Sequence, residues 1–350
     1  FDSSLFAVQY FGRDARRTAD VRSHRQEGIG RMRRLLIAIA AASAFGGTAS
    51  QAADTISVGV QPATQPIYIA RAAGFLAPIE KKYDVTFEFQ NFSYGAPENQ
   101  AMAAGAIQMA SAGMGPAIVA AARLPAKLVA ITILDQTAII VPTGSEIKSV
   151  ADLKGKKIAY PGRGSQQYPL LIKALADAGM TEDDVELFKT KGSDVGSLIA
   201  SKQVDAGMTW DPHISSALAD GSAEVLLTSK AILPIKDGHY IGNGFYIRED
   251  FIEAHPDIVQ DVVDALVKAE KLILSQPETA IDMWEKEIGF PRQVIEYSLN
   301  KGISVYTADI TPDEKAVAEY TTFLKSAEIL TAEDAPKVDA SFAEKAKNAE

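Results

Sequence analysis

Two stretches of the chain share the same order of small apolar residues, glycine and proline. The first runs from Gly105 to Pro116 and the second from Lys202 to Pro212. Each pattern predicts a short strand and a turn, with a proline near the start of the next helix, where its missing N–H costs nothing. Such corners leave backbone N–H groups free at the carboxyl edge of a parallel sheet, where α/β proteins bind small, often anionic ligands. Two corners therefore predict two lobes that each supply half of one binding site.

The first corner turns at Gly113 and Met114. Glycine has no Cβ, so a ligand can approach the backbone closely. Met114 predicts a soft, apolar wall, which disfavours a small inorganic anion such as nitrate. A tight turn without any ligand is the alternative interpretation of both residues.

The second corner turns at Trp210 and Asp211, which are our strongest candidates for ligand contact. An indole ring forms an apolar wall, and its N–H is a hydrogen-bond donor. Asp211 either accepts from a ligand hydroxyl or amine, or caps the helix that follows.

A third group of candidates lies before and at the start of a predicted helix over residues 166–178. Ser165 is a good N-cap, and a helix N-terminus attracts negative charge. Arg163 either clamps a sulfonate or carboxylate with two hydrogen bonds or is a plain surface arginine. Gly164 and Gln166 complete this group.

Further polar and aromatic candidates lie at the ends of predicted strands and near the predicted crossings between lobes. The turn after the first strand either contacts the ligand or is a turn set by its prolines, and the tyrosine after the second strand either lines the cleft or packs beneath a helix. These candidates are Gln61, Thr64, Gln65, Tyr94, Thr137 and Asn243.

No set of residues indicates catalysis or metal binding. Beyond residue 52 the histidines are His213, His239 and His255, which have no metal-ligand spacing, and there is no nucleophile elbow or phosphate-binding glycine motif. The chain has no cysteine, which excludes disulfides, thiolate metal sites and a cysteine nucleophile. We therefore expect no catalytic residue, no metal and no cofactor.

Alternating strand and helix patterns predict the scaffold that positions these residues. Strand patterns over 55–61, 85–91 and 107–112 alternate with helical ones over 67–83 and 96–104. This order predicts an α/β protein with a mostly parallel sheet flanked by helices in each lobe.

The lobes are expected to exchange the chain twice. Strand patterns over 129–134 and 138–141 are separated by only three residues, and a pattern over 241–248 returns to the first lobe. We predict a first lobe made of residues 54–137 and 238–350, rich in helices after residue 256, and a second lobe made of residues 138–237.

The first 52 residues are not expected to belong to the fold. Residues 1–31 are arginine-rich without an apolar period, and we interpret them as sequence translated ahead of a true start at Met32, with a disordered extension as the alternative. Two arginines, the apolar stretch 35–44 and small residues at 50–52 predict a signal peptide over 32–52 and export to the periplasm.

The composition, 47% hydrophobic and 23% charged, is that of a soluble globular protein. The formal charge is −10, and because residues 1–52 hold eight arginines and four acidic residues, the remainder carries −14. Such acidity argues against nucleic acid as a partner. It does not exclude an anionic ligand, since backbone amides can bind one locally.

Five elements of the chain, in order, resemble the periplasmic substrate-binding proteins of nitrate/sulfonate/taurine ABC importers. They are the residues 58–61, 105–116, 149–159, Gly164-Ser165 before a leucine-rich helix, and 204–206 leading into Trp210-Asp211-Pro212. The resemblance covers about residues 54–310. It implies a two-lobed periplasmic-binding-protein fold of type II, a ligand cleft between the lobes, and delivery of the ligand by a monomer to a permease in the inner membrane.

The combined hypothesis is a receptor for a small organic anion, a sulfonate or carboxylate with an apolar part. Taurine, alkyl sulfonates, aromatic acids, thiamine precursors, nitrate and bicarbonate all stay open as ligands. One alternative is an enzyme on the same fold, such as a desulfinase or a thiamine-pyrimidine synthase, although these designs depend on cysteine. The other alternative is a binding module that serves a periplasmic sensor.

Overall fold

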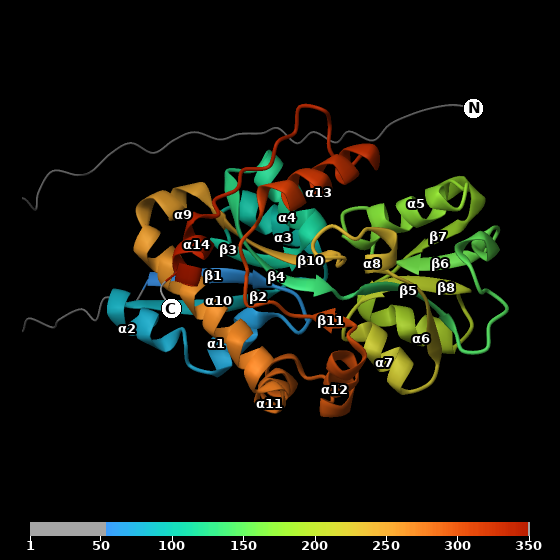
Figure 1. Ribbon diagram of the computed structural model, residues 1–350, viewed down its shortest axis with the longest axis horizontal. Helices are drawn as coiled ribbons and strands as arrows, with labels where there is room; N and C mark the ends of the chain where they lie inside the picture. The colour runs from blue at the N-terminus through green and yellow to red at the C-terminus, as the bar shows by residue number, and fades with distance from the viewer. Residues whose placement is uncertain (1–53, 349–350) are drawn as a thin grey trace, which may run out of the picture. The chain divides into compact units, whose positions relative to one another are not determined.

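The computed structural model describes residues 54–348. The expectations for residues 1–31 and for the signal segment 32–52 lie outside the described residues. Within that range the strands form two sheets with helices packed against them, which confirms the α/β class (Figure 1). No helix of the described range is long and apolar enough to cross a bilayer.

The first sheet has six strands in the order β11-β4-β10-β3-β1-β2. They come from two separate stretches of the chain: β1 (Asp54–Val60), β2 (Val85–Asn91), β3 (Met109–Gly113), β4 (Ala126–Asp135), β10 (Ile241–Arg248) and β11 (Ser304–Val305). The strands predicted over 85–91 and 241–248 are confirmed to the residue.

The second sheet has five strands in the order β7-β6-β8-β5-β9. All of them come from one stretch of the chain: β5 (Thr137–Pro142), β6 (Lys157–Tyr160), β7 (Glu186–Lys189), β8 (Ala206–Trp210) and β9 (Ala223–Thr228). The division of the chain into lobes at 137/138 and 237/238 stays a prediction.

Both sheets are mixed, so the expectation of mostly parallel sheets was wrong. β1 runs parallel to β2 and β3, whereas β10 runs antiparallel to β3 and β4. In the second sheet β6 is parallel to β7 and β8, and β5 is antiparallel to β8 and β9. The reason is the crossings: β5 and β10 begin at the edge facing the other sheet, where their neighbours end.

Strand alternation and helix amphipathicity explain the two cores on the faces of the first sheet. In β1, the side chains of Ile56, Val58 and Val60 all enter one core, as a period of two requires. Helices α1 (Pro66–Ala72), α10 (Pro256–Ser275), α11 (Pro277–Ile288) and α14 (Ser341–Asn348) fill that core. Helices α3 (Gly95–Ala103), α4 (Met114–Arg123) and α13 (Glu314–Ser326) contribute to the core on the opposite face.

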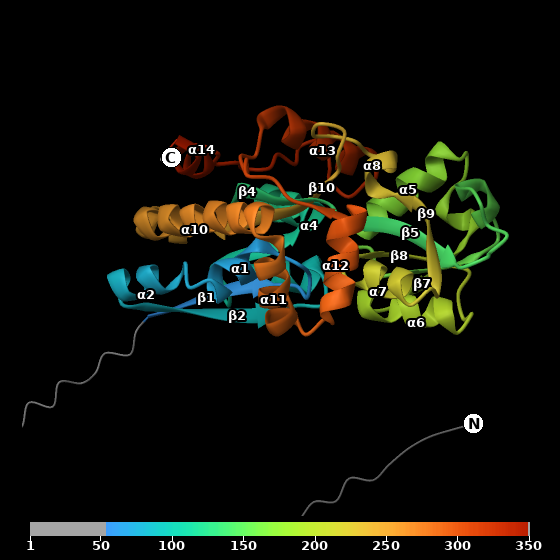
Figure 2. The same ribbon diagram turned by 60° about the horizontal axis from the view of Figure 1, so that its bottom comes forward.

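The second sheet has α5 (Gln167–Asp177) on one face and α6 (Val195–Ala200) and α7 (His213–Ala219) on the other (Figure 1). Helix α12 (Arg292–Lys301) packs against α7 and so joins the two groups of elements (Figure 2). The other helices are α2 (Ala77–Tyr83), α8 (Ser229–Ile232) and α9 (Glu249–Ala254), with 3-10 turns at Val150–Leu153, Glu182–Asp184 and Gly192–Asp194.

Prolines start the long helices as the sequence predicts, at Pro66, Pro256 and Pro277. The chain after α13 was not predicted. It returns to β4, where Leu128 N donates to Lys337 O at 3.0 Å and Leu128 O accepts from Asp339 N at 2.9 Å.

The two crossings between the sheets are tied to each other. Asp135 and Gln136, between β4 and β5, have left-handed φ angles of 63° and 60°. Asp135 Oδ2 lies 2.8 Å from His239 Nδ1 on the returning crossing, and Gln136 Nε2 donates to Gly242 O at 3.0 Å. This compact joint is where we expect the lobes to pivot.

Candidate ligand-binding site

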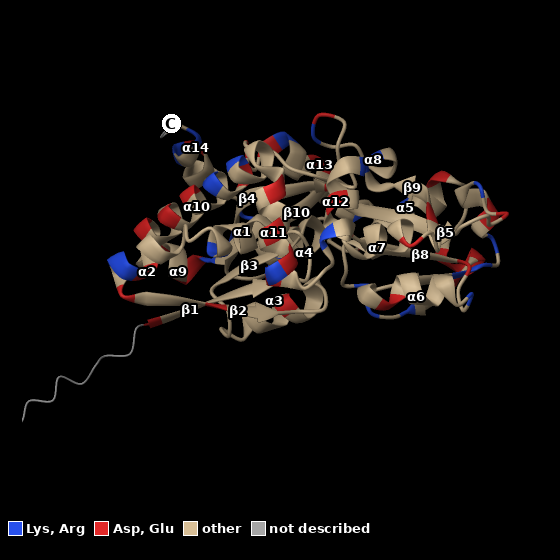
Figure 3. Ribbon diagram, turned by 90° about the horizontal axis from the view of Figure 1, so that it is seen from below, with Lys and Arg blue, Asp and Glu red and all other residues tan. Residues whose placement is uncertain are grey.

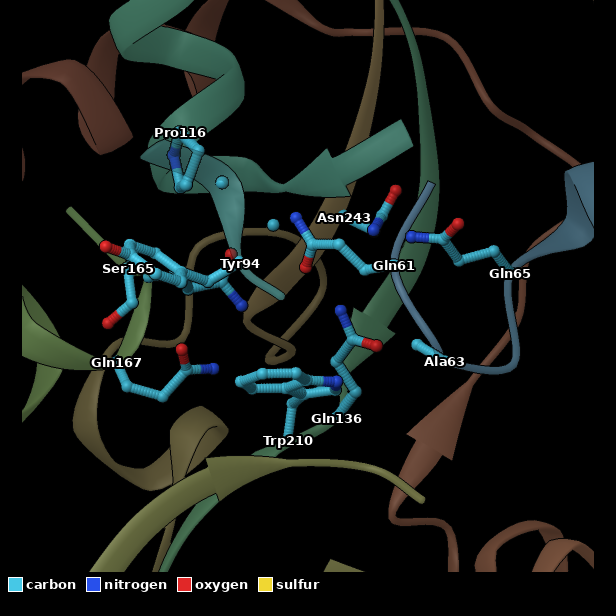
Figure 4. A pocket seen from close by; sticks show the side chains of 13 residues that line it. Gln61, Ala63, Gln65, Tyr94, Pro116, Gln136, Ser165, Gln167, Trp210 and Asn243 are labelled. Atoms are coloured by element: carbon cyan, nitrogen blue, oxygen red, sulfur yellow. The ribbon is translucent and has the colours of Figure 1, made fainter. Parts of the chain in front are cut away.

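A pocket lies between the two sheets, at the ends of β1, β3 and β8 that face each other. Side chains from both sheets surround it (Figure 4). It is lined by Gln61, Ala63, Gln65, Tyr94, Gly95, Gly113, Pro116, Gln136, Ser165, Gln166, Gln167, Trp210 and Asn243. Residues that are far apart in the sequence, and that belong to both predicted halves, therefore meet in one place.

Eight predicted site residues line this pocket: Gln61, Gln65, Tyr94, Gly113, Ser165, Gln166, Trp210 and Asn243. Their contact with a ligand stays a prediction. The sequence reading missed the lining residues Ala63, Gly95, Pro116, Gln136 and Gln167. Gln136 lies inside the predicted crossing, and Gln167 and Ala63 are next to predicted residues. Their positions in the sequence therefore indicated the site, although the alanine side chain carries no polar group.

Three helices begin at the pocket. Their N-cap residues are Tyr94 for α3, Gly113 for α4 and Gln166 for α5, and within the described chain none of the three receives a side-chain cap. The Gly115 N–H in the first turn of α4 bonds to the Tyr320 hydroxyl. First-turn N–H groups of these helices that have no protein partner are available to another acceptor. The expectation that Ser165 caps α5 was wrong, because its hydroxyl donates to Gly162 O at 2.7 Å and the helix begins later.

Six carboxamides surround the pocket, and their outer hydrogen bonds fix how they face it. Asn243 Oδ1 accepts from Ser111 Oγ at 3.1 Å and from Thr132 Oγ1 at 2.9 Å, which leaves its NH2 group as a donor. Gln65 Nε2 donates to Ser111 O at 2.8 Å. Gln167 Nε2 donates to Thr137 Oγ1 at 3.2 Å, so predicted Thr137 lies behind the lining rather than in it.

Trp210 is the apolar wall of the pocket. Its ring lies directly over Gly192, where a Cβ would come within 2.2 Å of it, and its edge contacts His213 with ring centroids 5.2 Å apart. The indole Nε1 is buried and has no hydrogen-bond partner among residues 54–348. A buried donor of this kind costs free energy unless an acceptor meets it, which points to a ligand.

Asp211, the other residue of this corner, faces away from the pocket. It is fully buried, and its Oδ1 accepts from Ser215 N at 3.2 Å and from the Ser215 hydroxyl, in the first turn of α7. Its Oδ2 accepts from Ser304 Oγ at 3.2 Å. Of the two roles that the sequence left open, the geometry is that of the cap. Burial raises the pKa of this carboxyl.

The remaining predicted residues lie outside the lining. The Arg163 guanidinium pairs with Glu182 at 2.8 Å and contacts Tyr168, so it is engaged on the outer surface. Met114 is fully buried against β10 and forms no part of the wall. Thr64 is also buried, with no hydroxyl partner in the described range.

Glycines bring the two sides of the pocket into contact. A Cβ at Gly164 would lie 2.5 Å from the Ala96 Cβ of α3, and one at Gly113 would lie 2.8 Å from Gln166 Oε1. The pocket is correspondingly narrow, with about 10 Å³ open to the centre of a water molecule. This is room for about one water, so an organic ligand requires the two sides to separate.

The lining is neutral. Among the residues that line the pocket in the described chain there is no Lys, Arg, Asp, Glu or His. Lys, Arg, Asp and Glu residues are instead spread over the helices and outer loops of the ribbon (Figure 3). Behind the lining, Glu98 of α3 is fully buried and accepts from Gln61 Nε2 at 2.7 Å, and burial raises the pKa of its carboxyl to about 8.

Comparisons with known proteins agree on the fold. A putative aliphatic sulfonates-binding protein of Escherichia coli is 29% identical over 268 residues, which is 74% of this chain and 80% of that protein. The alkanesulfonate-binding protein SsuA from Xanthomonas axonopodis pv. citri, bound to MOPS, superposes with a TM-score of 0.68 at 25% identity, over 80% of this chain and 95% of its own.

An enzyme shares the architecture. The desulfurization enzyme DSZB has a TM-score of 0.59 at 16% identity, over 85% of this chain and 99% of its own, which shows the fold alone. The similar structures also include the periplasmic aliphatic sulphonate binding protein SsuA from Escherichia coli and the periplasmic nitrate-binding protein NrtA from Synechocystis PCC 6803. These binding proteins confirm the predicted two-lobed periplasmic-binding-protein fold. The model of the NMT1/THI5-like family matches residues 61–280, well over half of the chain. The chain therefore belongs to the NMT1/THI5-like family, and its similar proteins include sulfonate-binding periplasmic proteins.

Proposed function

We propose that this protein is the periplasmic solute-binding receptor of an ABC importer and binds a small organic anion with a sulfonate or carboxylate head. The observation that carries the proposal is the convergence of three uncapped helix N-termini and the unpartnered Trp210 N–H on one pocket. Each of these is a hydrogen-bond donor, and helix N-termini favour negative charge.

The donor set suits a charged head that is held without a counter-ion. Burying an anion costs several kcal/mol unless it is fully hydrogen-bonded. The backbone N–H groups of α4 and α5, the Asn243 amide and the Trp210 indole are placed to supply those bonds. Ala63, Pro116 and the Trp210 ring supply the apolar surface for the rest of the ligand.

The relatives support this class of ligand, since two of them are sulfonate-binding proteins by name. Because the helix termini come from both lobes, the ligand completes its contacts only when the lobes are together and so favours closure. We propose that the monomeric closed receptor then delivers its ligand to the permease.

A binding role is favoured over an enzymatic one. The desulfinase and thiamine-pyrimidine synthase designs depend on cysteine, and this chain has none. In addition, the lining offers no nucleophile with a base beside it within residues 54–348. A sensor rather than a permease as the partner is compatible with the same pocket. Finding a permease gene beside the gene for this protein would favour transport.

The test is thermal unfolding of the purified protein with a panel of alkyl sulfonates, taurine, small carboxylates, aromatic acids, nitrate, bicarbonate and pyrimidines. A ligand at 100 times its dissociation constant stabilises the folded state by about 2.7 kcal/mol. We expect saturable stabilisation by one or more sulfonates or carboxylates. Stabilisation by a pyrimidine alone, or by nitrate alone, would contradict the proposed ligand class.

A pair of variants locates the binding. Trp210→Phe keeps an aromatic wall but removes the N–H. It should lower the affinity for the ligand found in the panel. Arg163→Gln is the control, because its guanidinium is engaged with Glu182 away from the pocket. Loss of affinity in the control with unchanged affinity in Trp210→Phe would move the site to the outer surface.

A further inference from the structure

One buried carboxyl group stands directly behind the pocket. Glu98 lies in the first turn of α3, has no exposed surface, and is in contact with Gln61, which lines the pocket. Its Oε1 has no hydrogen-bond partner among the described residues. Ionised carboxylates in protein interiors require several donors, so this environment suits a neutral acid.

The distance between the two groups supports the same view. The Gln61 nitrogen position lies 2.7 Å from Glu98 Oε2. That separation is at the short end for N–H···O and typical of O–H···O. A half turn of the carboxamide exchanges its nitrogen and oxygen with nearly unchanged positions. The Gln61 oxygen would then accept a proton that Glu98 donates.

The two arrangements present opposite groups to the pocket. When Glu98 is ionised it can only accept, so Gln61 must donate its NH2 to it and offer its oxygen to a ligand. When Glu98 carries a proton, Gln61 can accept with its oxygen and offer its NH2 instead. Only the second arrangement suits an anion.

We propose that Glu98 is a specificity-determining residue that, as a neutral acid, turns the Gln61 NH2 group toward the pocket and so selects an anionic ligand. The inference rests on the proposed function, since it assigns a polarity to the same site. Loss of the Glu98 proton turns the Gln61 carboxamide so that its oxygen faces the pocket. It also adds a buried negative charge behind that residue. Anion binding and protonation of Glu98 therefore support each other.

The other titratable groups near Glu98 do not change charge over the same range. Tyr68 of α1 and Tyr246 of β10 face it, and burial raises the pKa of both phenols well above the usual value. Beyond Tyr68 lies the ion pair of Arg71 and Glu287. The pKa of Glu98 near 8 thus sets the pH at which the response occurs.

The experiment is isothermal titration with ethanesulfonate, whose charge is constant, at about pH 6 and about pH 9. If only the protonated form binds, affinity at the higher pH is about tenfold weaker, and binding takes up a proton when the pH is near 8. Glu98→Gln keeps a donor and an acceptor and should bind equally at both pH values, as tightly as the wild type at pH 6. Glu98→Gln with an undiminished pH response would overturn the proposal.

Two further variants test whether the pH response depends on the Gln61 carboxamide or only on the buried charge of Glu98. Gln61→Met cannot reverse its polarity, so it should bind more weakly at pH 6 and lose most of the pH response; a full response in this variant would overturn the role of Gln61. Glu270→Gln is the matched control, because Glu270 is also fully buried with a raised pKa but does not line the pocket. It should keep the wild-type response.

Infrared spectroscopy without ligand tests the protonation of Glu98 independently of the proposed function. We expect the carboxylic-acid C=O absorption at pH 6 to contain a component that is lost in Glu98→Gln, is kept in Glu270→Gln and fades near pH 8. Identical absorption in the wild type and in Glu98→Gln contradicts a neutral Glu98. A normal band without any ethanesulfonate binding instead contradicts the sulfonate form of the proposed function, and with it the anion role of Gln61.

Discussion

The two strand-to-helix corners have similar sequences, yet their helix N-termini are used in opposite ways. At the first corner the N-cap Gly113 has no side chain to cap α4 and lines the pocket, so this helix N-terminus lies at the pocket, with the Gly115 N–H bonded to the Tyr320 hydroxyl. At the second corner Asp211 fills the first turn of α7 and bonds across to Ser304. The first corner offers backbone to a ligand, whereas the second offers only the Trp210 side chain and uses its helix terminus for stability.

The largest expected effect comes from removing the acceptor of the second corner. Asp211→Ala leaves Ser215 and Ser304 without their buried partner and should lower the free energy of unfolding by about 3 kcal/mol, measured by urea denaturation. Ser304→Ala removes a single bond and should cost about 1 kcal/mol. Equal, small losses in both variants would show that Asp211 does not hold the corner together.

Acid should also act on the second corner. Burial lowers the pKa of His213 to about 4, below its unfolded value near 6.5. The unfolded state therefore binds more protons between these values, and stability is lost as the pH falls from about 6.5 toward 4, by up to about 3 kcal/mol. The His213→Phe variant keeps the aromatic contacts with Trp210 and Phe290, and its urea unfolding should show a flatter pH profile. An identical profile would place the acid sensitivity elsewhere.

A smaller effect is expected on binding at the second corner. Trp210→Phe should weaken the ligand by about tenfold, since a hydrogen bond to a charged group contributes about 1.5 kcal/mol or more. The free energy of unfolding without ligand should fall only slightly, because the packing that the smaller ring loses against Gly192 is partly offset by the removal of a buried donor without a partner. A large loss of stability would instead mean that the N–H has a structural partner.

The smallest change tests the first corner. A Cβ at Gly113 would approach Gln166 Oε1 within 2.8 Å, so Gly113→Ala pushes a flexible side chain and holds the two sides apart. We expect several-fold weaker ligand binding and a stability loss of about 1 kcal/mol or less. Gly221→Ala is the control for a stability loss away from the pocket, because Gly221 has a positive φ and open space around it. It should lose stability without a change in affinity. Unchanged affinity in Gly113→Ala would mean that α4 does not face the ligand.

The sequence predicted most of the scaffold because its signals are local. The proline at residue 256 marked where the helix-rich part of the first lobe begins, and the strand patterns over 85–91 and 241–248 matched β2 and β10. The mixed direction of the sheets was missed because strand direction depends on which edge the chain enters after a crossing, and no local pattern records that. Eight of the predicted residues line the pocket because they lie at or near the ends of strands or just before helices.

The misses at the site have the same origin. Arg163 has the right chemistry beside a helix terminus, but its partner Glu182 lies 19 residues further on and holds it outside. Glu98 resembles any acidic residue in the first turns of a helix, and only the packing of α3 against β1 shows that it is buried behind Gln61. Partners distant in the sequence decided both outcomes.

The return of the chain over β4 bears on how the protein avoids self-association. β11 is only two residues long, so most of β4 would otherwise present free backbone groups at the rim of the first sheet. The hydrogen bonds of Leu128 with Lys337 and Asp339 cover part of this rim, and Phe342 anchors the segment in the core. Exposed strand edges recruit other chains. Residues 337–342 therefore shield part of this strand edge, and we expect their deletion to favour association of the protein edge to edge.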